Sequence, residues 1–283
     1  MKKLSLLILW FLSTSTFAGY FKQGNLWYYF SNASSTTVSV ASDQTNANYS
    51  GLKTVVIPDS VENNEKKYAV TGINKEAFYG CSALEEVTLP AGLTSIGESA
   101  FRGCSAMSSI IVPNAVTSLG ASAFRDCSAL TSVVLGSSVA GFGEYAFYGC
   151  DRLQYIQIPA SVTMIESSAF SRCLALTKVE FAYGSKLTEI GSYAFASTAV
   201  SSFTAPSGLK IIDRYAFYNC WRLKSVILRG GIEEVRSDAF RSCTQLNHVV
   251  LGETLTSASR IFKECGEIET VENYSKFPFE DFL

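Results

Sequence analysis

The sequence predicts a β-rich solenoid of about nine to ten coils, each 22–25 residues long. Three observations lead to this fold class. A phenylalanine recurs at near-constant spacing, a cysteine stands three residues after it, and a short Val-x-Leu segment follows. A unit of this size cannot bury its apolar face alone, so neighbouring units must stack into one continuous core.

The repeat is marked by an Ala-Phe pair in eight successive units, and a ninth unit carries Ile261-Phe262. A cysteine follows three residues after each phenylalanine, except in the sixth unit, where Thr198 replaces it. We expect both residue types to point inward and to form ladders along the solenoid axis. The predicted ladder residues are Phe78, Phe101, Phe124, Phe147, Phe170, Phe195, Phe217 and Phe240, with Cys81, Cys104, Cys127, Cys150, Cys173, Cys220, Cys243 and Cys265.

Each unit combines short extended segments with tight turns. The Val-x-Leu segment, as at residues 87–89, places its first and third residues on one face of a strand. Five of the six prolines directly follow this position, where a residue without an N–H ends a strand. A second apolar pair, such as Leu93 and Ile96, predicts another short strand. The Ala-Phe motif predicts a turn, and in five units Gly, Asp or Asn, which tolerate left-handed backbone, precedes the cysteine.

The unit LTSIGESAFRGCSAMSSIIVP at residues 93–113 resembles the repeat of the BspA-like leucine-rich-repeat family of bacterial surface and secreted proteins. The resemblance covers about residues 51–272 and includes the first segment, GLKTVVIPDSVENNEKKYAVTGI. It implies a mixed, β-rich, right-handed leucine-rich-repeat solenoid. In family members of known role it also implies adhesion or binding of other proteins. The resemblance carries no catalytic residues to transfer.

The chain divides into four predicted segments. Residues 1–18 have a basic start, a short apolar core and a small-residue exit, which together predict a signal peptide and export to the cell surface, the periplasm or the medium. Residues 19–50 break the period and predict an N-terminal cap, with a β-hairpin formed by residues 26–30 and 36–40. Residues 51–273 form the solenoid, and residues 274–283 form a C-terminal tail or cap.

The eight cysteines of an exported chain would ordinarily suggest disulfides. The repeat argues against them, because Thr198 divides the ladder into runs of five and three. Both runs are odd, and Cys173 and Cys220 would lie two coils apart, about 9–10 Å, which is too far to bridge. We therefore predict mostly free, buried cysteines that behave as small apolar side chains.

Charge and motif content argue against several classes of function. The net charge is −2 and no basic block is present, so the chain lacks the electrostatic footprint of a nucleic-acid-binding protein. No segment is apolar over enough residues to span a membrane. No two cysteines are closer than 22 residues and His248 is the only histidine, so we expect no metal and no cofactor. Without a convergent acid, base or phosphate-binding loop, we expect no enzymatic activity.

Two surfaces are candidate binding sites. The outward central residues of the Val-x-Leu strands form a strand face, where we expect two exposed apolar pairs, Ile111/Val134 and Ile227/Val250. The other surface flanks the Ala-Phe motif and is rich in residue types that are frequent at interfaces. These residues could equally pack as ordinary ladders on neighbouring coils. We call this second set the aromatic–arginine stripe: Tyr79, Arg102, Arg125, Tyr145, Tyr148, Tyr193, Tyr215, Tyr218 and Trp221.

These observations lead to a functional hypothesis with two alternatives. The first hypothesis is an exported, non-enzymatic solenoid that binds another protein, for example an extracellular-matrix or serum protein, in adhesion to host or neighbouring cells. The alternative is a structural component of the cell envelope that associates with itself through the exposed apolar pairs. The third is glycan binding, which the tyrosines and acidic positions suggest without specific support.

Overall fold

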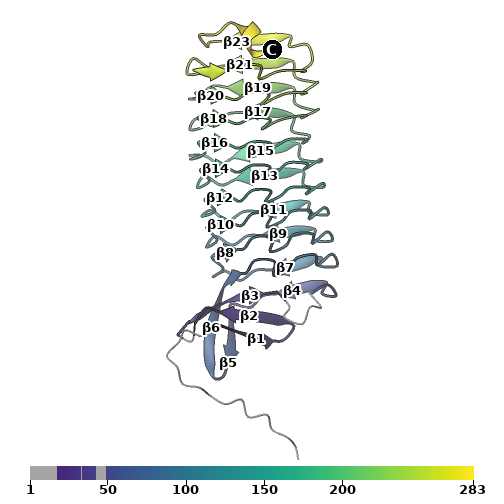
Figure 1. The fold of residues 1–283 in the computed structure, drawn as a ribbon, viewed down its shortest axis with the longest axis vertical. Helices are drawn as coiled ribbons and strands as arrows, with labels where there is room; N and C mark the ends of the chain where they lie inside the picture. Colours follow the sequence, from purple (N-terminus) through teal and green to yellow (C-terminus); the bar gives the residue numbers. More distant parts are fainter. Residues whose placement is uncertain (1–17, 33, 43–48) are drawn as a thin grey trace, which may run out of the picture.

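The computed structural model describes residues 18–32, 34–42 and 49–283, so the predicted signal peptide lies outside the described residues except for Ala18. The chain forms a column of stacked coils with a small sheet at its N-terminal end (Figure 1). The coils are built almost entirely from short strands and turns, and the one helix among the described residues is the 3₁₀ helix Phe279–Phe282. The predicted β-rich solenoid of about nine coils is confirmed.

One side of the column carries a continuous parallel ladder of two-residue strands, which we call the short-strand ladder. Each of these strands from β8 onward contains the second residue of the second apolar pair of the repeat, such as Ile96, while the first, such as Leu93, lies in the turn before it. The ladder begins at the end of β6 (Lys66–Ile73) and continues through β8 (Ser95–Ile96), β10 (Ser118–Leu119), β12 (Gly141–Phe142), β14 (Met164–Ile165), β16 (Glu189–Ile190), β18 (Ile211–Ile212), β20 (Glu234–Val235) and β22 (Ser257–Ala258).

Another side carries the Val-x-Leu strands, which form the Val-x-Leu ladder. This ladder is divided into four separate sheets, β4–β7, β9–β11, β13–β15 and β17–β19–β21–β23. Its strands are β4 (Thr54–Val56), β7 (Glu86–Thr88), β9 (Ser109–Ile111), β11 (Ser132–Val134), β13 (Tyr155–Ile158), β15 (Lys178–Phe181), β17 (Ser202–Thr204), β19 (Ser225–Leu228), β21 (His248–Leu251) and β23 (Thr270–Asn273).

The phenylalanines of the Ala-Phe motif stack in the centre of the column. Successive ring centroids from Phe78 to Phe262 lie 5.0–5.6 Å apart, and none of these nine side chains is more than 2% exposed. The rings are close to parallel along most of the stack, with interplanar angles of 3–10° in six of the eight pairs. Parallel coils place equivalent residues about 4.8 Å apart, which is close to the spacing at which aromatic rings pack.

The Ala-Phe turn is itself a hydrogen-bonded ladder. In the first coil Glu76, Phe78 and Gly80 donate their N–H groups to carbonyls of the next coil, at 2.9, 2.8 and 2.7 Å. This pattern requires positive φ two residues before and two residues after each phenylalanine, and all nine coils have it. The sequence predicted left-handed backbone at only five of the nine positions that precede the cysteine or Thr198, namely those with Gly, Asp or Asn. Arg172, Ser197, Ser242 and Glu264 are also left-handed, with φ of 56–61°, because the bonds between coils hold the backbone there.

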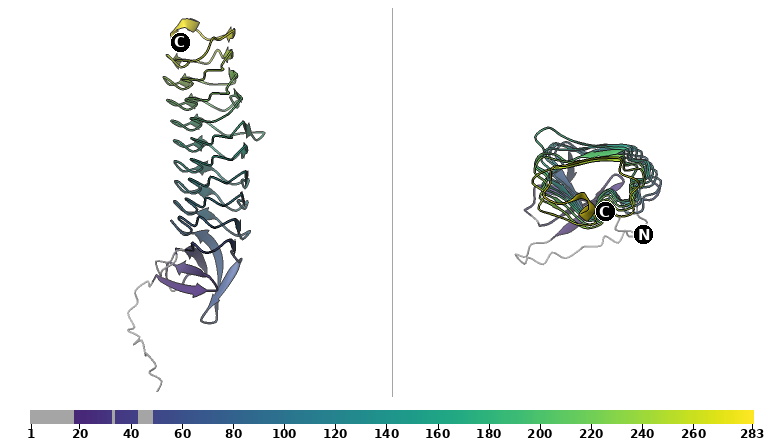
Figure 2. Two further views of the ribbon diagram at one scale, coloured as in Figure 1. Left: turned by 90° about the vertical axis from the view of Figure 1, so that its right-hand side faces the viewer. Right: turned by 90° about the horizontal axis from the view of Figure 1, so that it is seen from above.

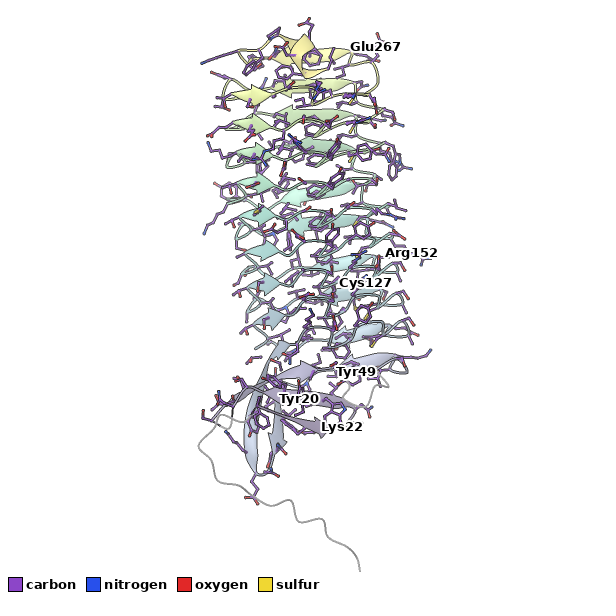
Figure 3. The ribbon with its side chains drawn as sticks, viewed as in Figure 1. Tyr20, Lys22, Tyr49, Cys127, Arg152 and Glu267 are labelled. Atoms are coloured by element: carbon purple, nitrogen blue, oxygen red, sulfur yellow. The ribbon has the colours of Figure 1, made fainter. Side chains whose placement is uncertain are left out.

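The cysteines point inward beside the phenylalanine stack, as Figure 3 shows for Cys127. Seven thiols donate to the carbonyl oxygen of the phenylalanine in the preceding coil, at 3.1–3.3 Å. Thr198 stands at the cysteine position of the sixth coil, but its hydroxyl donates to the Phe195 carbonyl of its own coil at 2.9 Å and lies 3.3 Å from Cys220 Sγ of the next coil. Seven cysteines are buried, as predicted, and Cys265 is partly exposed. Burial raises the pKa of the Cys81 thiol to about 11.

Aromatic residues cover both ends of the phenylalanine stack. At the N-terminal end, the ring of Tyr49 lies 5.2 Å from that of Phe78, below the first coil (Figure 3). At the other end, Phe262 donates its N–H to the Phe282 carbonyl at 2.8 Å, and Phe282 is fully buried. Residues 279–283 therefore continue the pattern of the Ala-Phe turn by a partial coil.

The N-terminal sheet joins the solenoid through β6. β1 (Gly19–Gln23) and β2 (Leu26–Phe30) are antiparallel, β2 pairs with β3 (Thr37–Ala41), and β3 runs parallel to β6. The expected hairpin is present as β2 and β3, and β1 is an additional strand that the sequence reasoning missed. β5 (Ser60–Asn63) forms a second hairpin with β6.

Candidate binding surfaces

The strand face is apolar and exposed in its first half. Val56, Ile111 and Val134 have exposed fractions of 71%, 68% and 52%. Val56 is in register with Thr88, and Ile111 is in register with Val134, so the four side chains form an outward row across β4, β7, β9 and β11, which a hollow of about 450 Å³ interrupts between β7 and β9. The expected exposure of the Ile111/Val134 pair is confirmed.

The expectation that Ile227 and Val250 form a second exposed pair is wrong. Val250 is only 3% exposed and Ile227 is half-buried. Arg229 from the preceding coil and Glu272 from the following coil form a 2.8 Å ion pair across the coil that carries Val250. The Arg229 guanidinium also lies 4.8 Å from the Tyr274 ring. Glu272 is in register with Val250, so this cluster covers the valine.

The first part of the aromatic–arginine stripe consists of cation–π contacts between coils. Arg102 lies 5.6 Å from the Tyr79 ring. Arg125 lies 5.3 Å from the ring of Tyr145 and 4.9 Å from the ring of Tyr148. The guanidinium of Arg172 lies 6.0 Å from the same Tyr148 ring. A hydrogen bond to Tyr148 raises the pKa of Arg172. These side chains therefore pack against each other on the surface.

The second part of the stripe is a tyrosine cluster. Tyr193 and Tyr215 stack with centroids 4.9 Å apart, and Tyr218 meets Tyr215 edge-on at 5.8 Å. Trp221 is half-buried just after Cys220, and no ring contact joins it to the other stripe residues among the described part of the chain. The structure thus brings most of the stripe together, but in ladder-like contacts between coils, so its rings are already partly covered.

A third surface was not singled out by the sequence analysis. A cleft of about 460 Å³ lies between β15 and β17, where the Val-x-Leu ladder is interrupted. The sequence carried a signal for it in the spacing of the phenylalanines. The step from Phe170 to Phe195 is the longest, at 25 residues, and the next coil lacks both its cysteine and one residue of its turn.

The repeat matches that of a known protein family. The BspA type leucine-rich-repeat region matches the chain in six copies, over residues 71–185 and 164–278. The chain belongs to this family.

Solved structures show the same fold as this BspA-type protein. A leucine-rich cell surface protein from Faecalibacterium prausnitzii is 23% identical, with a TM-score of 0.70 over 93% of this chain and 78% of that one. A leucine-rich-repeat protein from Bacteroides ovatus is 20% identical, with a TM-score of 0.52 over 90% of this chain and 89% of that one. The pneumococcal vaccine antigen PcpA is 17% identical, with a TM-score of 0.50 over 95% and 92% of the two chains. A search of curated proteins finds no match.

Within residues 18–32, 34–42 and 49–283, no three His, Cys, Asp or Glu side chains come together as a metal site would require. His248, half-buried in β21, has no such partners among those residues. In the same part of the chain, no helix has the length and apolar character needed to cross a membrane.

Proposed function

We propose that this BspA-type solenoid is an exported, non-enzymatic protein that binds a partner protein, such as an extracellular-matrix or serum protein, through the strand face. The observation that carries the proposal is the exposed row formed by Val56, Ile111 and Val134. Soluble monomers rarely leave adjoining β-branched side chains this open to water, and such patches mark interaction sites. Burying this row against a partner would release its ordered water and favour association.

Polar residues surround the row in the arrangement that is typical of binding sites. Ser109 and Ser132 are exposed beside Ile111 and Val134, and Lys53 forms a 3.2 Å ion pair with Glu85 at the margin. An apolar centre with a polar margin is the usual anatomy of a protein interface. The stripe supports the proposal less, because its tyrosines and arginines already have partners. The family, and the cell-surface protein among the similar structures, support a location outside the cell.

The test is the double substitution Ile111→Glu/Val134→Glu, measured by binding to a panel of purified matrix and serum proteins. Both side chains are more than half exposed, so the fold should tolerate the change, and a native circular-dichroism spectrum and melting temperature verify it. We expect the wild type to bind at least one panel protein and the double variant to lose that binding about tenfold or more, because two charges replace the apolar centre.

The matched control is Tyr215→Ala/Tyr218→Ala in the stripe, which should leave that binding unchanged. If the stripe variant alone loses binding, the strand face is the wrong surface. Light scattering of the wild type distinguishes the self-associating alternative. A concentration-dependent oligomer that the Ile111→Glu/Val134→Glu variant abolishes would assign the strand face to assembly and contradict the proposal.

A further inference from the structure

The cleft between β15 and β17 is the place where neighbouring Val-x-Leu strands separate most. β15 pairs only with β13, and β17 pairs only with β19. Ser201, just before β17, still donates its N–H to the carbonyl of Thr177, just before β15, at 3.2 Å. Among the described residues, no backbone hydrogen bond joins the two strands themselves. A hollow of about 450 Å³ also lies at the break between β7 and β9, but there and at the break between β11 and β13 the strands stay close together, whereas β15 and β17 diverge. The cleft is therefore closed at one end and opens toward Phe181 and Ala205.

The opening follows from two irregularities of the repeat. Phe181 and Phe203 stand at core-facing positions that hold aliphatic residues in most coils, and their rings meet edge-on, with centroids 6.2 Å apart and an interplanar angle of 82°. An edge-on aromatic pair needs more room than the 4.8 Å between paired strands. The same coil also carries two extra residues in the loop at 182–186, which has no proline to end the strand. Insertions in one coil of a solenoid often mark its binding face.

The polar groups that lose their inter-strand hydrogen bonds at the cleft are backbone N–H and C=O groups. In the regular register, Val179 and Phe181 would bond to Ser202 and Thr204, and these four residues line the cleft instead. Ala205 donates to Ile227 of β19 at 2.9 Å, so the N–H of Thr204, one residue earlier, points the other way, toward β15. An open strand edge of this kind is a template for pairing with another chain.

The two charged side chains that line the cleft, Lys178 and Glu180, form an ion pair with each other. Glu180 forms an ion pair with Lys178 and accepts a 2.6 Å hydrogen bond from the Tyr155 hydroxyl. These two contacts lower the pKa of the Glu180 carboxyl. No unpaired charge is therefore aimed at an ion or a polyanion, and the electrostatic complement of the cleft is a row of neutral peptide dipoles.

Tyr183 lies between Ala182 and Gly184, which line the open end of the cleft, and its own ring points into solvent. Its exposed fraction is 105%, the highest among the large apolar side chains of the described residues. A tight turn presents the ring: Ser185 donates its N–H to the Ala182 carbonyl at 3.1 Å, and Gly184 between them has φ of +72°. Figure 2 shows a loop that projects from the side of the column at this level. Tyrosine combines large contact area with a hydroxyl and is frequent among the residues that dominate binding energy.

We propose that the cleft between β15 and β17 binds an extended, uncharged segment of a partner protein. The backbone of this segment adds to the open strand edges, and its side chains pack against Tyr183 and the partly exposed ring of Phe181. This is peptide recognition by strand addition, in which the main-chain bonds supply affinity. The site lies on the same side of the column as the exposed row of Val56, Ile111 and Val134 but farther along the chain, between β15 and β17, and it does not depend on the function proposed above.

The test uses the full chain and a phage-displayed library of random twelve-residue peptides. We expect selection to yield peptides that bind the wild type, and hydrogen exchange to show protection of the amides of Val179, Phe181 and Thr204 on binding. Thr204→Pro removes the N–H at the cleft edge without removing a bond to β19, and Tyr183→Ala removes the exposed ring. Each variant should weaken peptide binding by about tenfold.

The control variants are Tyr20→Ala, an exposed tyrosine (51%) on the N-terminal sheet, and Ile111→Glu/Val134→Glu on the strand face. Both should bind the selected peptides as the wild type does. The proposal is overturned if selection yields no binder, if Thr204→Pro and Tyr183→Ala both bind unchanged, or if protection appears elsewhere. Because the strand-face variant tests the other surface, failure of one proposal leaves the other measurable.

Discussion

The Ala-Phe turn and the Val-x-Leu strand occur in the same coils, yet they form ladders of different continuity. The turn ladder runs without interruption from Phe78 to Phe262, whereas the Val-x-Leu ladder is broken in three places. Each turn is held to its neighbours by stacked rings and backbone bonds, and at seven of the eight junctions also by a thiol bond to the phenylalanine carbonyl of the preceding coil. Each Val-x-Leu strand is held mainly by its backbone bonds and turns one residue outward.

This difference indicates how the molecule separates stability from recognition. Ring stacking and backbone bonds at every turn, with a thiol bond at most of them, keep the coils in register even where the strands on the other side lose their pairing. The strand side can therefore open, bulge or expose apolar residues without breaking the column. Ile111, Val134 and Tyr183 all lie on or beside Val-x-Leu strands, and the comparison leads to three further predictions.

High pH should have the largest effect, because it acts on the turn ladder of six coils at once. Burial raises the pKa of six thiols, those of Cys81, Cys104, Cys127, Cys150, Cys173 and Cys243. Their neutral forms stabilise the fold fully below the unfolded-state pKa of about 8.5, and this stability is lost as the pH rises above it. Each thiol contributes a loss of about 1.4 kcal/mol per pH unit, so six give roughly 8 kcal/mol per unit.

We expect cooperative unfolding above about pH 9, seen as simultaneous loss of circular dichroism and appearance of thiolate absorbance. Between pH 6 and 8 the free energy of unfolding should be insensitive to these thiols. Thiolates that form gradually near pH 8.5 in a protein with native circular dichroism would show that the cysteines are not buried in the turn ladder.

Phe147→Ala should have the next largest effect, because it removes a ring from the middle of the continuous stack. Phe147 is fully buried between Phe124 and Phe170 at 5.2 Å on each side. Truncation should lower the free energy of unfolding by about 3–5 kcal/mol, measured by urea denaturation. Tyr183→Ala, with its exposed ring, is the control and should change it by less than about 0.5 kcal/mol. Equal effects would contradict the division between the two sides.

A pair of proline substitutions compares a paired strand with the open edge. Ile227 lies in β19, which is paired on both sides, so Ile227→Pro removes a ladder bond and should cost about 1–3 kcal/mol. Thr204 occupies the register position of Ile227 in β17, but its N–H faces the cleft. Thr204→Pro should therefore cost less than about 1 kcal/mol. Urea denaturation measures both, and an equal loss would mean that the Thr204 N–H is already bonded.

Much of the fold could be predicted because the same pattern of inward residues and turns recurs in nine units. The spacing of the phenylalanines, the position of Thr198 and the prolines after the strands led to the coil, the ladder and the inward cysteines. The Ile111/Val134 pair could be predicted because its exposure depends only on strand alternation. Val250 occupies the same position in the repeat and is buried, because Arg229 and Glu272 meet across it from two different coils. A repeat pattern contains no information about contacts that skip a coil.

The sequence by itself determined the coil, its inward residues and the membership of the family, because stacking demands the same side chain at the same place in every unit. Only the tertiary structure decided the left-handed backbone at Arg172 and Glu264, the cover over Val250 and the cleft beside Tyr183. The physical reason is common to all three. Each depends on bonds and ring packing between different coils, which override or interrupt the local preference of any one unit.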